Sequence, residues 1–263
     1  SLTNANLAAW LQKIVEERGL EADTLNVQFR SDVFAKAVQS GNLPALSDCV
    51  QHVNSAADWI NYCASDNAVY GNAGATIVQQ LAFALASGNE YLGMKPDFAS
   101  QLFFNFSIGP NYFLEIAKFR AFSILWEQVL SEYEITGCSA YLTAETGAWN
   151  KTKTDAHNNM IRSTTEAMSA ALGGCAAITV HRYDEHFAEE SSFASRIARN
   201  AQLILQEESY LNKVADPGAG SYYIEALTDA LAKECWALFQ KIEQKGGFHA
   251  CLQSGFIQEL VST

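Results

Sequence analysis

Short apolar runs alternate with helical patterns along this chain, and this alternation constrains its fold more than any other feature. Five runs have the length and composition of a β-strand: residues 25–29, 67–70, 102–106, 140–143 and 176–180. Helical periodicity lies between and after them, at residues 32–40, 44–64, 75–87, 112–133 and 156–172. Strands that alternate with helices form βαβ units, in which the strands pair in parallel. The sequence therefore predicts an α/β protein with about five parallel strands.

Helices are also expected at both ends of the chain. Apolar residues recur at helical spacing in residues 4–18, a segment that Gly19 ends. Two long helices, at residues 192–214 and 222–244, complete the pattern. Eight strands of this kind would close a barrel, and an open doubly wound sheet is the alternative. No strand is followed by the GxGxxG signature of a dinucleotide-binding sheet.

The composition argues against several classes of function. The chain has 263 residues, 49% of them hydrophobic, so it can bury a sizeable core in one large or two small domains. A formal net charge of −12 argues against binding to nucleic acid or to anionic membranes. No apolar stretch approaches the roughly 20 residues that span a bilayer. The six cysteines are scattered and form no CxxC pair, which predicts reduced thiols in a cytoplasmic protein.

Two motifs near the C-terminus contain more fixed polar positions than helix packing requires. The first is RIARNAQLIL at residues 196–205, in which Arg196, Arg199 and Asn200 share one helix face. The second is DPGAGSYYIE at residues 216–225, a turn that leads into a helix. Together they resemble the RIARNxQLIL and DPxGGSYYVE patterns of the methylmalonyl-CoA mutase family. Ala219 stands where that family usually has glycine.

The resemblance implies a fold. The catalytic part of this family is a (β/α)8 TIM-type barrel, and residues 25–247 resemble its latter part, strands four to eight with the closing helices. We therefore expect a partial TIM-type barrel that forms a single domain, residues 1–263, without the family's cobalamin-binding domain.

The resemblance also implies where catalytic residues would lie, and this chain departs from the family there. Catalytic members have a Tyr-His pair in a GYHMQEAGA-like stretch at the end of the fifth barrel strand. The matching residues 67–75 are NAVYGNAGA, which places Ala68 and Val69 at the Tyr and His positions and Asn72 at a glutamate. Neither Ala nor Val can transfer a proton. Tyr70 is the alternative, but on a strand it would point to the opposite face.

A second departure lies on the next strand. Catalytic members have an RLSFFWGIG-like sequence there, whose Arg and Ser contact CoA. The matching residues 101–109 are QLFFNFSIG, so Gln101 replaces the Arg and Phe103 replaces the Ser. Loss of the guanidinium removes the group best suited to hold phosphate. Both departures are expected of a barrel that no longer binds substrate.

Some residues are candidates for a residual, cofactor-facing pocket: Glu145, Trp149, Asn158, Asn159 and Glu166. Trp149 ends the sequence TGAW, which is similar to the family's TSGW loop. Asn159 and Glu166 are seven residues apart and so share a helix face. The preferred interpretation is structural: the polar groups cap or bridge neighbouring loops, and Trp149 anchors the core.

The sequence DEH at residues 184–186 resembles only part of the family's Asp-x-His-x-x-Gly cobalt-binding motif. Glu189 stands at the glycine position, so we interpret Asp184 and His186 as part of an exposed acidic loop. The other histidines have no metal-ligand spacing, and no cysteine lies in a nucleophile motif. The sequence predicts no metal site.

These observations favour the non-catalytic small subunit of a heterodimeric methylmalonyl-CoA mutase, or a domain of it. The resemblance implies that a large catalytic partner binds adenosylcobalamin and interconverts methylmalonyl-CoA and succinyl-CoA, and that this chain binds no cofactor itself. One alternative is a mutase barrel of altered specificity, which would use Tyr70, Glu145 or Glu166. Another is a CoA-binding regulatory barrel, although the chain offers no basic cluster for the phosphates.

Overall fold

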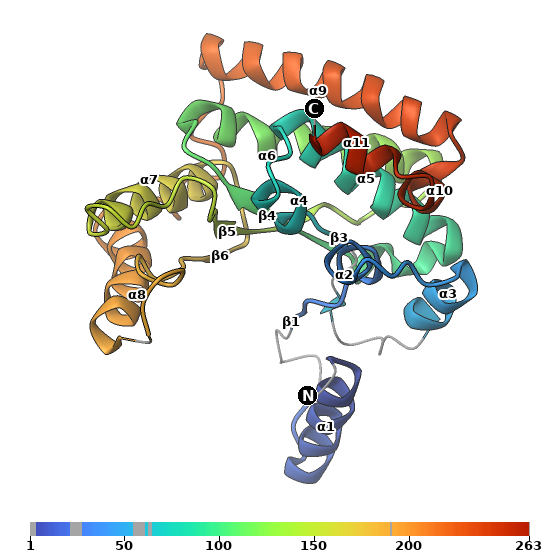
Figure 1. The fold of residues 1–263 in the computed structure, drawn as a ribbon, viewed down its shortest axis with the longest axis horizontal. Coiled ribbons are helices and arrows are strands. Elements are labelled where there is room, and N and C mark those ends of the chain that lie inside the picture. Colours follow the sequence, from blue (N-terminus) through green and yellow to red (C-terminus); the bar gives the residue numbers. More distant parts are fainter. Residues whose placement is uncertain (1–3, 22–27, 55–60, 63–64, 190, 263) are drawn as a thin grey trace.

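A computed structural model describes residues 4–21, 28–54, 61–62, 65–189 and 191–262 of the chain. Its centre is a four-stranded parallel sheet in the order β3-β4-β5-β6, formed by β3 (Ser65–Asp66), β4 (Phe103–Ile108), β5 (Tyr141–Thr146) and β6 (Ala177–Thr179). A separate parallel pair joins β1 (Gln28–Phe29) and β2 (Asn61–Tyr62). Helices flank the sheet, whose described strands do not close into a barrel (Figure 1). The predicted α/β fold, a partial TIM-type barrel, is confirmed.

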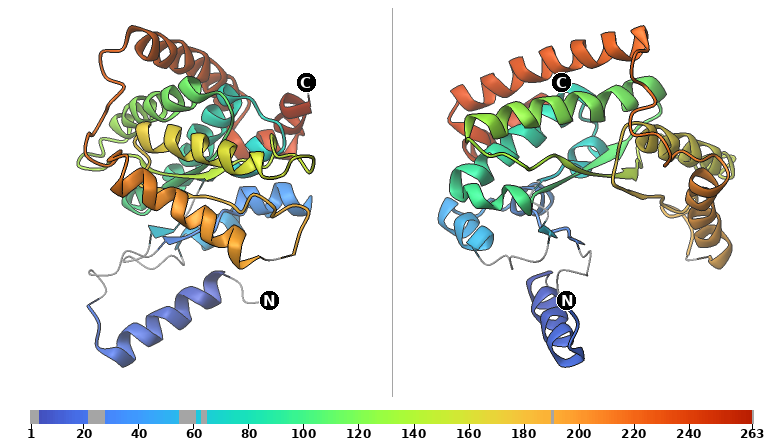
Figure 2. Two further views of the ribbon diagram at one scale, coloured as in Figure 1. Left: turned by 90° about the vertical axis from the view of Figure 1, so that its left-hand side faces the viewer. Right: turned by 180° about the vertical axis from the view of Figure 1, so that it is seen from behind.

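One face of the sheet is covered by two layers of helices (Figures 1 and 2). α5 (Ile77–Met94) and α6 (Tyr112–Glu132) lie against the sheet, and α9 (Tyr222–Gln244) packs on both of them. The chain ends with α10 (Gly247–Gln253) and α11 (Phe256–Ser262), and α10 also contacts α5. α7 (Asn158–Leu172) and α8 (Ser192–Glu207) pack together at the β6 side of the sheet.

The remaining elements lie near β3 or toward the N-terminus. They are α1 (Asn4–Arg18), α2 (Val33–Ser40), α3 (Leu46–Asn54), α4 (Ala68–Asn72) and the 3-10 helix η2 (Pro96–Ser100). Side-chain caps begin three of the described helices, including α8, where the Ser191 hydroxyl accepts from Ala194 N–H. Asp32 accepts from the backbone N–H groups of Phe34 and Ala35 at the start of α2, and Thr76 and Gln79 form a capping box on α5. No helix among the described residues is long and apolar enough to cross a membrane.

The alternation of side chains along β4 divides the sheet into an apolar and a more polar face. Phe104, Phe106 and Ile108 are fully buried in the main core beneath α5 and α6. The Phe104 ring centroid lies 4.6 Å from those of both Phe122 and Trp126. Asn105 lies on the opposite face, in register with Asp66 of β3 and Thr143 of β5. The helix-covered face therefore supplies the core, and the other face can hold charged and hydrogen-bonding groups.

Most predicted elements are confirmed, but the strand predicted at residues 67–70 is wrong. β3 ends at Asp66, and Ala68–Asn72 forms α4. The physical reason lies at Asn67. Its side-chain Nδ2 donates to the Ser65 hydroxyl at 2.6 Å, and its backbone carbonyl accepts from Gly71 N–H at 3.1 Å. These bonds turn the chain into a helix directly after the strand.

Other boundaries also differ from the predictions. Of the helical pattern expected within residues 44–64, Leu46–Asn54 forms α3 and Asn61–Tyr62 forms β2, while residues 55–60 and 63–64 lie outside the described residues. The helix expected at residues 192–214 ends at Glu207, and Tyr210 adopts a positive φ of 53° that is incompatible with a continuing helix. α10 and α11, beyond residue 244, were not predicted. Of the strand predicted at residues 25–29, only Gln28–Phe29 lies within the described residues.

Candidate functional site

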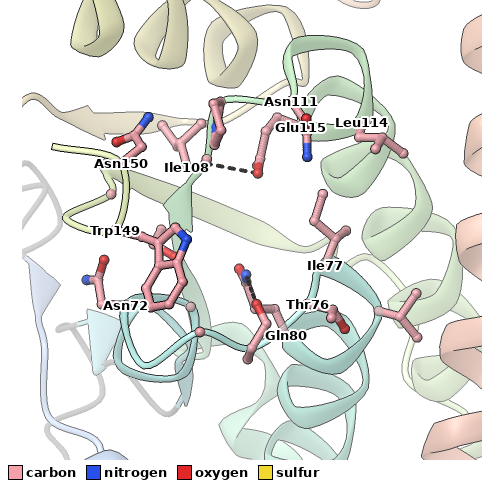
Figure 3. Close-up of a pocket in the computed structure, with 18 of the residues that line it drawn as sticks. Asn72, Thr76, Ile77, Gln80, Ile108, Asn111, Leu114, Glu115, Trp149 and Asn150 are labelled. Atoms are coloured by element: carbon pink, nitrogen blue, oxygen red, sulfur yellow. Dashed lines mark hydrogen bonds between the residues drawn. The ribbon is translucent and has the colours of Figure 1, made fainter. Parts of the chain in front are cut away.

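A cavity of about 440 Å³ opens at the carboxyl ends of β4 and β5, beside α4 and the start of α5 (Figure 3). This is the end of a parallel α/β sheet at which ligands bind in barrels and open sheets alike. Its wall contains four glycines, six aliphatic residues and several uncharged polar side chains. The polar or charged side chains that line it are Asn72, Thr76, Gln80, Ser107, Asn111, Glu115 and Asn150, with Trp149 at the rim. The cavity has the size and the largely apolar lining of a small-molecule site.

Trp149 lines this cavity instead of anchoring the core, which corrects the structural interpretation made from the sequence. The side chain is 73% exposed and stands on the loop after β5, facing Ile77 across the cavity (Figure 3). The neighbouring backbone is fixed, because Ala148 N–H donates to Asn72 Oδ1 at 2.9 Å. Gly74 lies beside the indole ring and has a positive φ of 103°, a backbone conformation that favours glycine. The ring is thus held at the rim with one face uncovered by the core.

The one acidic residue among the described lining residues, Glu115, is paired with a buried lysine. Glu115 of α6 lines the cavity and forms a buried ion pair with Lys118, one turn later in the helix. Its Oε1 also accepts from Gly109 N–H at 2.9 Å. Lys118 is fully buried and donates to the Ser107 carbonyl at 2.7 Å. This pair joins α6 to the end of β4 and leaves Glu115 poorly placed to exchange protons with a ligand.

The residues at the expected catalytic positions lie outside the cavity lining. Ala68 and Val69 occupy the first turn of α4, and Ala68 is buried. Tyr70 points into the core, where its ring packs edge-on against Phe83 and Phe248. Its hydroxyl has no hydrogen-bond partner among the described residues, and burial raises its pKa well above the ordinary value. None of the three lines the cavity.

The second pair of replaced positions lies at the opposite end of β4. Gln101 is buried just after η2, and Phe103 is the first residue of the strand. The Phe103 ring packs edge-on against Tyr141 with their centroids 6.4 Å apart. The cavity opens at Ile108, the last residue of β4. Phe103 therefore occupies space on the more polar face of the sheet, one strand length from the cavity.

A network of charged side chains crosses the more polar face of the sheet. Arg30 donates to both carboxylate oxygens of Asp66, at 2.8 and 2.9 Å, and contacts Glu145 of β5. His181, which follows β6, extends this network. Its Nε2 lies 3.7 Å from Glu145 Oε2, and its Nδ1 lies 2.8 Å from Glu185 Oε2. Glu145 therefore belongs to this ion network and does not line the cavity.

The network shifts the pKa values of its members. Burial alone would raise the pKa of Glu145, but the nearby His181 imidazole and the charge of Arg30 outweigh it, so the pKa is lowered. For His181, the interaction with the Glu145 carboxylate raises the pKa, and burial opposes it only in part. Both shifts favour the charged pair, which ties β5 to the turn that follows β6.

We predict a pH-dependent contribution of His181 to stability. Because the folded-state pKa is raised above the unfolded value of about 6.5, the contribution is fully present below that value. It should fade as the pH rises through the folded-state pKa. Urea unfolding from about pH 5 to about pH 8 should therefore show wild type exceeding a His181→Gln variant most at the acidic end. A difference that is constant across this range would contradict the assignment.

The other three pocket candidates lie in a polar cluster around α7. Lys151 Nζ lies 2.7 Å from both carboxylate oxygens of Glu166, and Asn150 Nδ2 donates to Oε1 at 2.6 Å. Burial raises the pKa of Glu166 and lowers that of Lys151, while their mutual attraction opposes both shifts. Asn159 is buried and joins two loops, because its Nδ2 donates to the backbone carbonyls of Thr152 and Tyr183. Asn158 is exposed. Of the five candidates, only Trp149 lines the cavity.

Residues 184–186 form part of a turn. The sequence predicted that Asp184 would be exposed, but it is buried. Asp184 is buried and pairs with Arg182 at 3.0 Å, whereas Glu185 and His186 are exposed. Among the described residues, no group of three or more His, Cys, Asp or Glu side chains could hold a metal ion.

The second C-terminal motif has a structural role that the sequence alone did not reveal. Arg120 of α6 pairs with Asp216 at 3.0 Å and with Glu225 at 2.9 Å. Glu225 also accepts from Gly220 N–H, so the turn is closed on itself. The motif thus binds the start of α9 to α6. The sequence analysis missed Arg120, Lys118, Lys151 and Arg30, because a single basic residue does not indicate its partner.

A family model described as methylmalonyl-CoA mutase matches residues 2–263. The chain belongs to the methylmalonyl-CoA mutase family. It is 46% identical over 202 residues to the methylmalonyl-CoA mutase small subunit of Porphyromonas gingivalis, an alignment that covers 73% of this chain and 33% of that protein. It is 34% identical over 264 residues to the methylmalonyl-CoA mutase of Rhizobium meliloti, covering 94% and 37%. The small subunit of Streptomyces virginiae is 33% identical over 271 residues, covering 98% and 44%.

Large-subunit relatives are also similar to this member of the mutase family. The large subunits of P. gingivalis and S. virginiae are each 37% identical over 193 residues, which is 70% of this chain. Small and large subunits are therefore both present in these organisms. The chain spans about a third of the length of the first of these relatives.

Proposed function

We propose that this chain is the small, non-catalytic subunit of a heterodimeric, adenosylcobalamin-dependent methylmalonyl-CoA mutase, or a domain of that subunit. In this proposal residues 1–263 form a single barrel-derived domain in the cytoplasm. It binds the catalytic large subunit, which holds the cofactor and interconverts methylmalonyl-CoA and succinyl-CoA. The greater similarity to the P. gingivalis small subunit than to its large subunit supports this assignment, 46% against 37% identity.

The chemistry of the cavity is the observation that carries the non-catalytic role. The described residues that line it include no His, Tyr, Lys, Arg, Cys or Asp. Its one carboxylate, Glu115, is held by Lys118. General acid–base catalysis needs a titratable group within hydrogen-bond reach of the reacting atoms. Ala68 and Val69 cannot provide one, and Tyr70 points away into the core. The lining therefore favours a supporting subunit over a mutase of altered specificity.

Turnover with and without a partner tests this proposal. The protein incubated alone with adenosylcobalamin and methylmalonyl-CoA should form no succinyl-CoA. Added to the separately purified large subunit, it should co-elute with that subunit in size-exclusion chromatography and restore or increase its activity. Succinyl-CoA formation by the chain alone, or no complex with the large subunit, would contradict the proposal.

A Tyr70→Phe variant distinguishes the non-catalytic subunit from a mutase barrel of altered specificity. Because the hydroxyl has no hydrogen-bond partner among the described residues, its removal should leave the complex fully active and change the free energy of unfolding by less than about 1 kcal/mol. Matched Glu145→Gln and Glu166→Gln variants should likewise retain the rate of the complex once folding is confirmed by circular dichroism. If any of the three slowed the complex by about a hundredfold or more, as removal of a general acid or base does, a catalytic role for this chain would be favoured.

A further inference from the structure

We propose that α10 and α11 form a pH-sensitive cover, which is held closed while Glu243 is protonated and loosens when Glu243 ionises. The inference does not depend on the proposed subunit role, because it uses contacts within this chain alone. Three features carry it: an aromatic cluster beneath the two helices, a carboxylate that holds the turn between α9 and α10, and a second carboxyl group beside that turn.

α10 and α11 cover part of the core. Phe248 of α10 is fully buried, and its ring packs edge-on against Phe34 of α2 and Tyr70 of α4, with centroids 5.5 and 6.1 Å apart. α11 is tied to the start of α5, because Gln79 Nε2 donates to the Leu260 carbonyl at 2.7 Å. Loosening of these helices would therefore expose large apolar rings to water.

The turn between α9 and α10 is held by a carboxylate of α5. Glu90 Oε2 accepts from the backbone N–H groups of Phe248 at 2.9 Å and His249 at 3.4 Å. Gly247 has a positive φ of 89°, and a Cβ there would lie 2.6 Å from the same oxygen. The backbone comes this close to Glu90 only because position 247 is glycine. The position of α10 is therefore sensitive to charge around Glu90.

Glu243, in the last turn of α9, adds a second acidic group at this turn. Its Oε1 is buried and has no hydrogen-bond partner among the described residues. Burial, followed by the charge of Glu90, raises the pKa of Glu243 to about 6, and the nearby Asn89 side chain opposes this rise only in part. The ionised form is therefore the costly one while the helices are closed.

The groups around the turn do not neutralise the two carboxylates. Titratable neighbours include Lys245, Tyr133, His249, Cys49 and Cys251. The Lys245 ammonium lies over the Phe256 ring, 4.5 Å from its centroid, and His249 Nε2 lies 3.0 Å from the Pro44 carbonyl. Burial raises the pKa values of the tyrosine and of both thiols, so these groups are uncharged near neutral pH. Ionisation of Glu243 therefore adds a second negative charge beside Glu90.

The sign of the pH dependence follows from the raised pKa of Glu243. A carboxyl group with a higher pKa in the closed than in the open state favours the closed state when it is protonated. The pKa rises from the ordinary 4.5 to about 6, so this preference is complete below about pH 4.5 and is lost as the pH reaches about 6. The full shift corresponds to about thirtyfold in the opening equilibrium, and the partial exposure of Glu243 reduces the expected effect to about tenfold.

Native-state hydrogen exchange at about pH 4.5 and about pH 7, corrected for intrinsic exchange rates, measures this opening. The opening equilibrium constant of the α10 amides should rise about tenfold in the wild type, relative to amides of α6. A Glu243→Gln variant should lose most of this rise, since its side chain stays neutral. Glu234→Gln, an exposed position on the same helix, is the matched control and should behave as the wild type.

A second variant tests the pairing of the two carboxylates. Glu90→Gln keeps an oxygen that can accept from Phe248 N–H but removes the charge, so the rise should shrink to a few fold. Asp32, buried at the start of α2, also has a pKa raised to about 6, and it is unchanged in each of these variants. A full rise in either Glu243→Gln or Glu90→Gln, or wild-type α10 amides that follow those of α6, would overturn the proposal.

Discussion

Replacing Lys118 with methionine should destabilise the protein by about 3–5 kcal/mol, because it leaves the Glu115 carboxylate buried without its counter-ion. The variant also removes the donor to the Ser107 carbonyl at the end of β4. Methionine keeps most of the side-chain volume, so a packing defect contributes little. Urea unfolding followed by circular dichroism gives the free energy of unfolding directly.

Two companion variants identify the cause of this loss. The Lys13–Glu17 pair on α1 is separated by 3.9 Å and well exposed, so Lys13→Met should change stability by less than about 1 kcal/mol. Replacing both members of the buried pair, as in Glu115→Leu with Lys118→Met, should recover much of the stability lost in the single variant. If the double variant is less stable than Lys118→Met, the isolated carboxylate is not the source of the effect.

Truncation of Trp126 to alanine should cost a similar amount, about 3–5 kcal/mol, because it opens a cavity where α5, α6 and β4 meet. Trp126 is almost fully buried and contacts the rings of Phe104 and Phe122. The matched control is Ile124→Ala on the same helix, since that side chain is 55% exposed. We expect the control to change the free energy of unfolding by less than about 1 kcal/mol.

Gly88 of α5 provides a second test of this packing. A Cβ at Gly88 would lie 2.7 Å from the Trp126 ring and 3.0 Å from Phe104, so Gly88→Ala should be destabilising in the wild type. In a Trp126→Ala background the added methyl group has space, and the same substitution should be neutral or stabilising. Additive effects of the two substitutions would show that they do not share one packed site.

The sequence was most informative where one periodicity was strong and long. β4, β5, α6, α7 and α9 were predicted close to their observed positions, because apolar residues repeat there with a clear strand or helix spacing. Residues 67–70 failed for a local reason. Ala68, Val69 and Tyr70 form an apolar run typical of a strand, but the hydrogen bonds of Asn67 turn the chain into α4.

The candidate site was predictable only in part. Trp149 was singled out from its motif, but its exposure at the cavity rim depends on how the loop after β5 packs against α4. Lys118 and Ser107 gave no signal in the sequence, because a single Lys or Ser in an apolar pattern does not indicate its partner. Glu145 and Glu166 were singled out as polar positions, and tertiary contacts assign them to two separate ion networks.

The sequence by itself determined the α/β class, the order of most helices and strands, and membership of the mutase family. These properties follow from periodicity and from short motifs, which are local in the chain. Only the tertiary structure decided which polar side chains meet. Arg30 reaches Glu145 across 115 residues of sequence, and Arg120 reaches Glu225 across 105. Such contacts depend on strand register and helix packing. The sequence therefore shows the charge of each residue but does not identify its partner.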